Sequence, residues 1–221
     1  MDIKIPYTPR KHQSFLHNKI SKHRWSVLVC HRRFGKTVCM INHLIRSALL
    51  SKQKNPRYAY ISPTFKQSKS IAWDYMKQFT AKIPYTKFNE TELRVDLPNG
   101  ARITLLGAEN SDGLRGIYLD GCVIDEYANV HSKLFPEIIR PALSDRKGYC
   151  VFIGTPQGMN NNFYELYQHA QGADDWFNYI AKASDTKIVD PEELVKAKEV
   201  MGDKKYQQEF ECDWIANIEG A

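Results

Sequence analysis

Short apolar runs alternate with longer helical patterns along most of the chain. The runs at 25–30 (WSVLVC), 58–62 (YAYIS), 120–125 (DGCVID) and 149–154 (YCVFIG) are continuous, which is typical of strands that are covered on both faces. After the first run, apolar residues at 38–49 recur at the three- and four-residue spacing of one helix face. Strands that alternate with helices in this way predict a parallel sheet with helices on both sides.

Three further segments complete the predicted elements. Residues 65–82 continue as a helix after the second strand. Residues 92–107 predict a hairpin, because two alternating segments flank a Pro-Asn-Gly turn. After about residue 176 the pattern changes to two polar helices, PEELVKAKEV and KKYQQEFECDW, around a Met-Gly-Asp break. We therefore divide the chain into an α/β core at 1–175 and a small helical segment at 176–221.

Composition and charge narrow the class of protein only slightly. The chain has 221 residues, of which 43% are hydrophobic, so it can bury one good-sized α/β core with a small appendage. The formal net charge of +6 suits a nucleic-acid partner but is common in unrelated proteins. No apolar stretch reaches the ~18 residues of a membrane span, and the N-terminus lacks the apolar region of a signal peptide. We expect a soluble cytoplasmic protein.

The cysteines point to a reducing compartment. There are five, an odd number, and no two of them form a C-x-x-C pair. Cys30, Cys122 and Cys150 lie inside apolar runs, as buried free thiols do. This pattern argues against disulfides and against a zinc site.

The segment VCHRRFGKTVCM, residues 29–40, comes close to the phosphate-binding pattern G-x-x-x-x-G-K-[ST]. Gly35, Lys36 and Thr37 match the pattern, whereas Cys30 replaces its first glycine. An apolar strand precedes the loop and an amphipathic helix follows it. Gly35 would let backbone N–H groups approach a phosphate, Lys36 would add a charge, and the Thr37 hydroxyl could bind Mg²⁺. Taken alone, the segment could also be a basic loop that contains G-K-T by coincidence.

Two later strands end in residues that suit the same site. The run CVIDEY delivers Asp125, which could hold Mg²⁺ through water, and Glu126, which could polarise an attacking water. The run FIGTPQG leaves Thr155 at a strand end, where its hydroxyl could sense the γ-phosphate. Each run also has a plainer interpretation. The first could be an ordinary strand that ends in charged residues, and the second could be a turn built from glycine and proline. Their combination with the loop predicts an ATPase, with the Thr155 strand between the other two.

The set of motifs resembles the ATPase domain of the large terminase subunit, the DNA-packaging motor of tailed bacteriophages. HRRFGKT is similar to that family's deviant Walker A loop, and GLRGIYLDGCVIDEYA to the stretch that leads into its Walker B acids. YISPTFKQSK and RPALSDRKGYCVFIGTPQGMNNNFYELY resemble its second motif and its coupling region. The resemblance implies a P-loop NTPase fold of the ASCE, RecA/helicase-like kind with a C-terminal helical lid, and ATP and Mg²⁺ as cofactors.

The resemblance also implies roles for single residues. Gln13 matches the glutamine that recognises adenine, and Arg32 or Arg33 would lie against the phosphates. Glu126 would be the catalytic base and Thr155 would couple hydrolysis to movement. Arg115 takes the place of an arginine finger, or else forms a surface salt bridge. The complete set implied for nucleotide, metal and catalysis is Gln13, Arg32, Arg33, Phe34, Gly35, Lys36, Thr37, Arg115, Asp125, Glu126 and Thr155.

The resemblance implies partners as well. The chain would pump double-stranded DNA into a procapsid in the host cytoplasm, together with the portal protein and the small terminase subunit. It would act as a ring, a pentamer, and be monomeric in isolation, with no membrane partner. The nuclease domain usual in the family has no counterpart here, and the end IANIEGA falls where a linker would begin. The alternatives are a helicase-like translocase, a nucleotide-dependent binding module and, on kinship alone, a nuclease.

Overall fold

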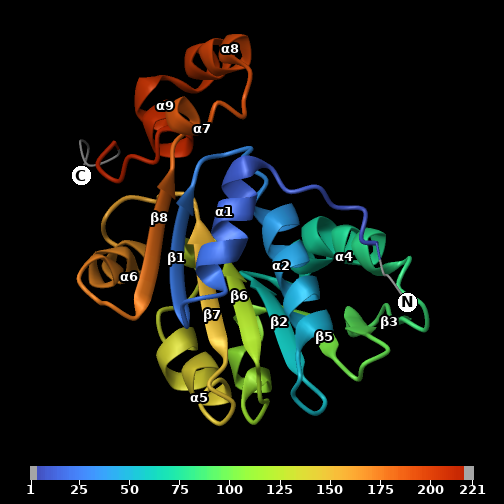
Figure 1. The fold of residues 1–221 in the computed structure, drawn as a ribbon. Coiled ribbons are helices and arrows are strands. Elements are labelled where there is room, and N and C mark those ends of the chain that lie inside the picture. The colour runs from blue at the N-terminus through green and yellow to red at the C-terminus, as the bar shows by residue number, and fades with distance from the viewer. Residues whose placement is uncertain (1–3, 217–221) are drawn as a thin grey trace.

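A mainly parallel sheet organises the computed structural model, which describes residues 4–216 (Figure 1). Within these residues the sheet has eight strands in the order β3-β4-β5-β2-β6-β7-β1-β8, and only β3–β4 and β4–β5 pair antiparallel. The strands are β1 (Trp25–Cys30), β2 (Arg57–Ser62), β3 (Lys87–Asn89), β4 (Arg94–Asp96), β5 (Arg102–Gly107), β6 (Gly121–Asp125), β7 (Tyr149–Gly154) and β8 (Trp176–Ala181).

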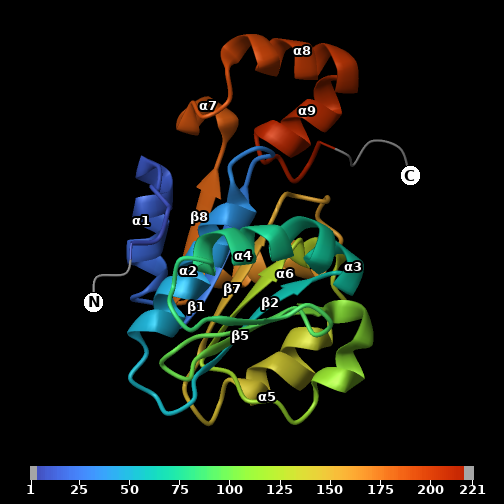
Figure 2. The same cartoon turned by 90° about the vertical axis from the view of Figure 1, so that its right-hand side faces the viewer.

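Helices cover both faces of this sheet, so that α1 and α5 lie on opposite sides of it (Figure 2). One face carries α1 (Lys11–Ile20), α2 (Lys36–Leu50), α3 (Phe65–Gln67), the π-helical turn η1 (Ser68–Ala72) and α4 (Trp73–Thr80). The connection after β5 contains η2 (Ala108–Leu114). The other face carries η3 (Tyr127–Asn129), η4 (Phe135–Ile139), α5 (Arg140–Ala142) and α6 (Asn162–Gln171). The last helices, α7 (Ala183–Thr186), α8 (Pro191–Met201) and α9 (Asp203–Phe210), stand above the carboxyl end of the strands.

The structure confirms most of the predicted elements. All four apolar runs are strands, and β7 lies between β1 and β6, as the site required. The predicted hairpin is the pair β4–β5, closed by a bond from Leu97 N–H to Ala101 O of 2.8 Å. Gly100 has φ +83° in this turn, a conformation that glycine adopts without strain. None of the helices in residues 4–216 is long and apolar enough to cross a membrane.

One grouping of residues needs correction. Residues 176–181, grouped with the C-terminal segment, form β8, which pairs in parallel with β1 over its whole length. This edge strand is half-buried, and Asn178 interrupts its apolar residues, so it is not the continuous apolar run of a central strand. The predicted helix at 65–82 is confirmed over 65–80, with the π-helical turn η1 inside it, where the buried Ser68 hydroxyl bonds Leu106 O at 2.8 Å. The division into a core and a lid stays a prediction, and residues 217–221 of the expected linker lie outside the described residues.

All five cysteines are buried free thiols. Cys122 and Cys150 are register partners on β6 and β7, and their sulfur atoms lie 3.4 Å apart. Burial raises the pKa of the Cys150 thiol, and its contact with Cys122 adds to that rise. The predicted buried free thiols at Cys30, Cys122 and Cys150 are therefore confirmed.

A pair of buried histidines joins α1 to α2. The rings of His17 and His43 stack at 5.4 Å, and their Nδ1 atoms lie 3.1 Å apart. The Tyr7 hydroxyl lies 3.0 Å from His17 Nε2. Burial, helped by the charge of Arg46, lowers the pKa of His17 to about 4 and that of His43 to about 3. Both rings are therefore neutral in the folded chain at neutral pH.

We expect these histidines to make the fold sensitive to acid. In the unfolded chain both titrate near 6.5, so below that pH it binds more protons than the folded chain. These histidines therefore leave the free energy of unfolding unchanged above about pH 6.5. At about pH 5 they make it lower by about 2 kcal/mol per histidine. Denaturant titrations at about pH 7.5 and about pH 5 measure the loss. His43→Phe should reduce it, whereas His131→Phe, at an exposed position, should not.

Candidate active site

The loop between β1 and α2 is shaped to receive a phosphate. Gly35 caps α2 with φ +88°, a left-handed conformation that favours glycine. A Cβ atom there would also lie 3.1 Å from the Gln13 amide nitrogen, which is a tight contact. The first N–H groups of α2 have no partner within the helix and carry the positive end of its dipole. Cys30 is fully buried at the end of β1, so a small side chain suffices where the usual loop has its first glycine.

Three predicted side chains meet at this loop. Lys36 Nζ donates a 2.9 Å hydrogen bond to Thr155 Oγ1 and lies 3.5 Å from Glu126 Oε1. The Thr155 hydroxyl in turn donates to the Cys30 carbonyl at 3.2 Å. They come from the start of α2, the end of β6 and the end of β7. The predicted convergence of Lys36, Thr155 and Glu126 is therefore present in the ligand-free chain.

Burial and charge oppose each other at this cluster. Burial disfavours the charged form of Lys36, but the carboxylates of Glu126 and Asp125 outweigh it and raise the pKa of the ammonium group. Burial raises the pKa of Glu126 despite the neighbouring Lys36, and the charge of Asp125 adds to the rise. A carboxylate with a raised pKa is a better proton acceptor than an ordinary one. The cluster therefore places the Lys36 ammonium group, which keeps its proton, beside the Glu126 carboxylate, which accepts a proton more readily than usual.

The second acidic residue has a partner that the sequence analysis did not identify. The hydroxyl of Tyr60, a buried residue of β2, donates to Asp125 Oδ2 and also interacts with the Thr37 side chain. The other oxygen, Oδ1, accepts from the Glu126 N–H at 2.9 Å. A tyrosine inside a strand that is otherwise apolar signals a buried hydroxyl in need of a partner. That signal could have singled out Tyr60.

Glu126 leaves the strand in an unusual backbone conformation. Its φ and ψ are +46° and +49°, in the left-handed region, which costs a residue other than glycine ~1–2 kcal/mol. Such strain is often found at functional sites. The turn directs the Glu126 side chain to Lys36 while Asp125 stays bonded to Tyr60. Two successive carboxylates therefore take two separate positions.

The predicted adenine residue lies beside the loop. Gln13 is buried, and its Nε2 donates to the Gly35 carbonyl at 3.4 Å, while its Oε1 accepts from the Arg10 N–H at 3.0 Å. Its amide therefore ties α1 to the loop. The Arg10 guanidinium donates to the Phe34 carbonyl at 3.3 Å. The Phe34 ring is fully buried against His31, so Phe34 could face a nucleotide only with its backbone.

The predicted arginines of the site lie at the surface. Arg32 and Arg33 are both exposed, and which of them faces the phosphates stays open. Arg115 follows η2 between Leu114 and Gly116, and Gly116 has φ +83° and open space around it. Its guanidinium pairs with Glu137 Oε2 at 3.8 Å, and both side chains are about half exposed. An ion pair this exposed contributes little to stability and can be exchanged for another partner.

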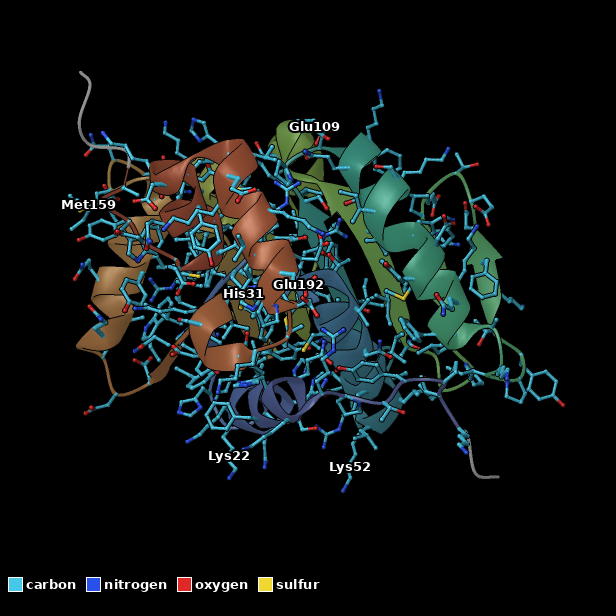
Figure 3. All side chains as sticks on the ribbon, turned by 90° about the horizontal axis from the view of Figure 1, so that it is seen from above. Lys22, His31, Lys52, Glu109, Met159 and Glu192 are labelled. Carbon is cyan, nitrogen blue, oxygen red and sulfur yellow. The ribbon has the colours of Figure 1, made fainter. Side chains whose placement is uncertain are left out.

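The C-terminal helices dock directly on the loop, which the sequence analysis did not anticipate. His31 is fully buried and lies below these helices in the view from above (Figure 3). Its Nε2 lies 2.8 Å from the Thr186 hydroxyl, and the Arg32 N–H donates to Glu209 O at 2.7 Å. The buried Gln208 amide donates to Pro156 O at 2.7 Å. α7 and α9 therefore contact the phosphate loop and the residue after Thr155 together.

This fold and this site define a P-loop NTPase in which three adjacent strand ends meet at one phosphate-binding loop. A sequence profile described as terminase large subunit, T4-like virus type, N-terminal, matches residues 29–221. The chain therefore belongs to the terminase large-subunit family, which confirms the resemblance stated from its motifs.

Relatives and solved structures agree with this assignment. Over 60 residues the chain is 42% identical to the large terminase subunit of Thermus phage G20c, an alignment that spans 27% of this chain and 12% of that protein. The large terminase ATPase domain of Thermus phage P74-26 has the same fold, with a TM-score of 0.79, 21% identity and 96% of each chain covered. The large terminase of a second bacteriophage, described as thermophilic, has a TM-score of 0.80 at 15% identity, over 94% of this chain and 54% of that one.

Proposed function

We propose that this chain is the ATP-hydrolysing motor domain of a large terminase, which powers the movement of double-stranded DNA into a procapsid. The observation that carries the proposal is the meeting of Lys36, Thr155 and Glu126 at one phosphate-binding loop. Phosphoryl transfer to water requires a positive charge that holds the phosphates, a hydroxyl beside the terminal phosphate and a carboxylate base. Family membership and the shared fold support the same activity.

ATP would bind with its phosphates along the loop at 30–37. The α2 N-terminus and Lys36 would hold the phosphates, together with Arg32 or Arg33. Gln13 would then exchange its present bonds for the adenine edge, which its position beside Gly35 allows. The large terminase of the thermophilic bacteriophage, which shares this fold, has been solved in complex with ADP and with ATP-γ-S.

The residues fit a Mg²⁺ ion. Thr37 and Asp125 both interact with the Tyr60 hydroxyl, so two oxygen side chains converge on one point. Oxygen ligands suit Mg²⁺, which retains several waters and takes other ligands from phosphate. Thr37 and Asp125 would hold the ion, and it would neutralise charge on the phosphates. Tyr60 would keep the Asp125 carboxylate in place.

Glu126 and Lys36 must separate before hydrolysis. In the ligand-free chain the Lys36 ammonium group lies between Thr155 and Glu126. A phosphate offers Lys36 more negative charge than one carboxylate does, so nucleotide binding would draw Lys36 away. Glu126 would then be free to accept a proton from the attacking water, with a pKa already raised by burial. Thr155 would report the γ-phosphate to Pro156, which bonds the lid through Gln208.

The wider assembly is also a proposal. α7 to α9 would act as a lid, and a nuclease domain would belong to the complete large subunit, because this chain spans only about half of the thermophilic-phage protein. A ring of subunits, a pentamer, would bind the portal protein and the small terminase subunit in the host cytoplasm. The isolated chain would be a monomer. It would hydrolyse ATP slowly, because the neighbouring subunits of the ring would be missing.

Phosphate release from ATP tests the proposal. We expect slow turnover by the purified chain that stops when EDTA removes Mg²⁺ and that rises per subunit with protein concentration. A fluorescent ATP analogue measures binding separately. If nucleotide binds but no phosphate appears at any protein or DNA concentration, the chain is a nucleotide-dependent binding module instead.

A further inference from the structure

The positive charge of this chain is concentrated in its first third. Residues 3–73 contain 15 lysines and arginines and no aspartate or glutamate, whereas residues 74–221 contain 16 against 24 acids. In the described residues 4–216, Lys36 is the one cation from that first third that forms an ion pair. Surfaces usually mix charges of both signs, so a region with a single sign suits a polyanion.

The fold gathers much of this charge on one side. α1 and α2 lie together on one face of the sheet, and Lys22 and Lys52 both project from the side where these helices lie (Figure 3). We name as the α1–α2 basic face the exposed cations of these helices and of the two residues after each, which are Lys11, Lys19, Lys22, Arg46 and Lys52. Glu109 lies on the opposite side of the molecule in the same view.

Two hollows are cut into this face. One, of about 590 Å³, lies between the N-terminal segment, α1 and α2, and the other, of about 510 Å³, lies where α1 and α2 end. Arg46 lines both. The second hollow also presents Lys22, Arg24 and Lys147, and Asp120 is the one acid among the described residues that line it. Asp120 is already engaged, by the Arg57 N–H at 2.7 Å and by Arg146.

The second hollow is separate from the nucleotide site. β1 begins at Trp25, directly after the second hollow, and ends at the phosphate loop, so the two sites lie at opposite ends of the strands. A polyanion bound at the second hollow would therefore be distinct from the bound nucleotide. Protein interfaces are depleted in lysine, whereas phosphate backbones are contacted by Lys, Arg, Ser and Asn side chains. Ser14, Asn18 and Ser47 line the hollows beside the cations.

We propose that the α1–α2 basic face binds the phosphate backbone of duplex DNA, without regard to base sequence. The choice of DNA over another polyanion rests on the proposed function, while the location rests on charge and shape. Because contacts of this kind release counterions, the affinity should fall steeply with salt. Arg46, shared by both hollows, would contact the backbone at the centre of the face.

Fluorescence anisotropy with a random-sequence duplex of about 25 base pairs, at about 50 mM salt, tests the proposal. Lys22→Ala, Arg46→Ala and Lys52→Ala together should weaken binding about tenfold or more and reduce the salt slope by about 0.9 per lost contact. The matched control is Lys87→Ala, Lys133→Ala and Lys196→Ala, which removes the same charge from exposed positions elsewhere. It should bind like the parent chain. Arg46→Lys alone should bind nearly as the parent does.

Three results would overturn the proposal. The parent chain could fail to bind the duplex, both triple variants could weaken binding equally, or poly-glutamate could bind the face while DNA does not, which would indicate an acidic protein partner. Circular dichroism establishes that each variant is folded. Basal ATP turnover without DNA is measured in parallel and should be unchanged in both triple variants. A loss of DNA binding with turnover intact therefore separates this proposal from the proposed ATPase.

Discussion

Glu126→Gln protein should bind ATP at least as tightly as the parent chain and hydrolyse it about 10²–10⁴-fold more slowly. The amide cannot accept the proton of the attacking water, so the chemical step loses its base. Binding should be retained because Glu126 now competes with the phosphates for Lys36, at 3.5 Å, and the amide ends that competition. Fluorescent-nucleotide binding and single-turnover phosphate release measure the two effects separately.

Glu126→Asp is the matched control for this substitution. It keeps the carboxylate but withdraws it by one methylene group, so it should bind ATP and retain more turnover than Glu126→Gln. If Glu126→Gln abolishes nucleotide binding, Glu126 holds the ligand or the fold, and its assignment as the base is wrong. The left-handed backbone at Glu126 makes a thermal melt of each variant a necessary companion measurement.

The parts of the site that were predictable from sequence are those with fixed local rules. Gly35, Lys36 and Thr37 occupy a strand–loop–helix unit, and Asp125 and Thr155 stand at the ends of apolar strands. In a parallel sheet those ends meet at one edge, so the pattern alone fixes their neighbourhood. Tyr60 and His31 were missed because their roles depend on the partners that the fold brings to them, Asp125 and Thr186.

The same distinction holds for the fold. Central strands are buried on both sides and read as continuous apolar runs, so β1, β2, β6 and β7 were predictable. β8 lies at the sheet edge and is half-buried, and Asn178 interrupts its apolar run, so it lacked the continuous pattern by which the central strands were identified. The π-helical turn η1 within the predicted helix coincides with a bond from Ser68 to Leu106, which is distant in sequence. Features that depend on contacts between residues far apart in the sequence therefore could not be predicted from local patterns.

Arg115→Ala should bind ATP normally but hydrolyse it roughly 10³–10⁵-fold more slowly under conditions in which the chain assembles. Charge builds on the γ-phosphoryl oxygens during the reaction, and a guanidinium from a neighbouring subunit stabilises it. Arg115 suits this task because it is exposed, lies in a segment bounded by Gly113 and Gly116, and pairs with Glu137 at the long distance of 3.8 Å. Turnover is measured against protein concentration.

Glu137→Ala separates the finger from a plain salt bridge. If the pair with Glu137 is what makes Arg115 important for turnover, Glu137→Ala should lower turnover as Arg115→Ala does. If Arg115 acts on a neighbouring site, Glu137→Ala should retain turnover while Arg115→Ala loses it. Arg140→Ala, which removes another exposed arginine, on α5, is the charge control and should behave like the parent chain.

Mixing two inactive variants decides whether Arg115 acts within its own subunit or on the next one. Arg115→Ala subunits keep Glu126, and Glu126→Gln subunits keep Arg115. In a mixed ring an intact arginine can complete an intact site across the interface, so part of the turnover should return. Phosphate release, measured over a range of mixing ratios, should be greatest near equal amounts. If mixed oligomers form and turnover stays at the level of the separate variants, Arg115 does not act across the interface.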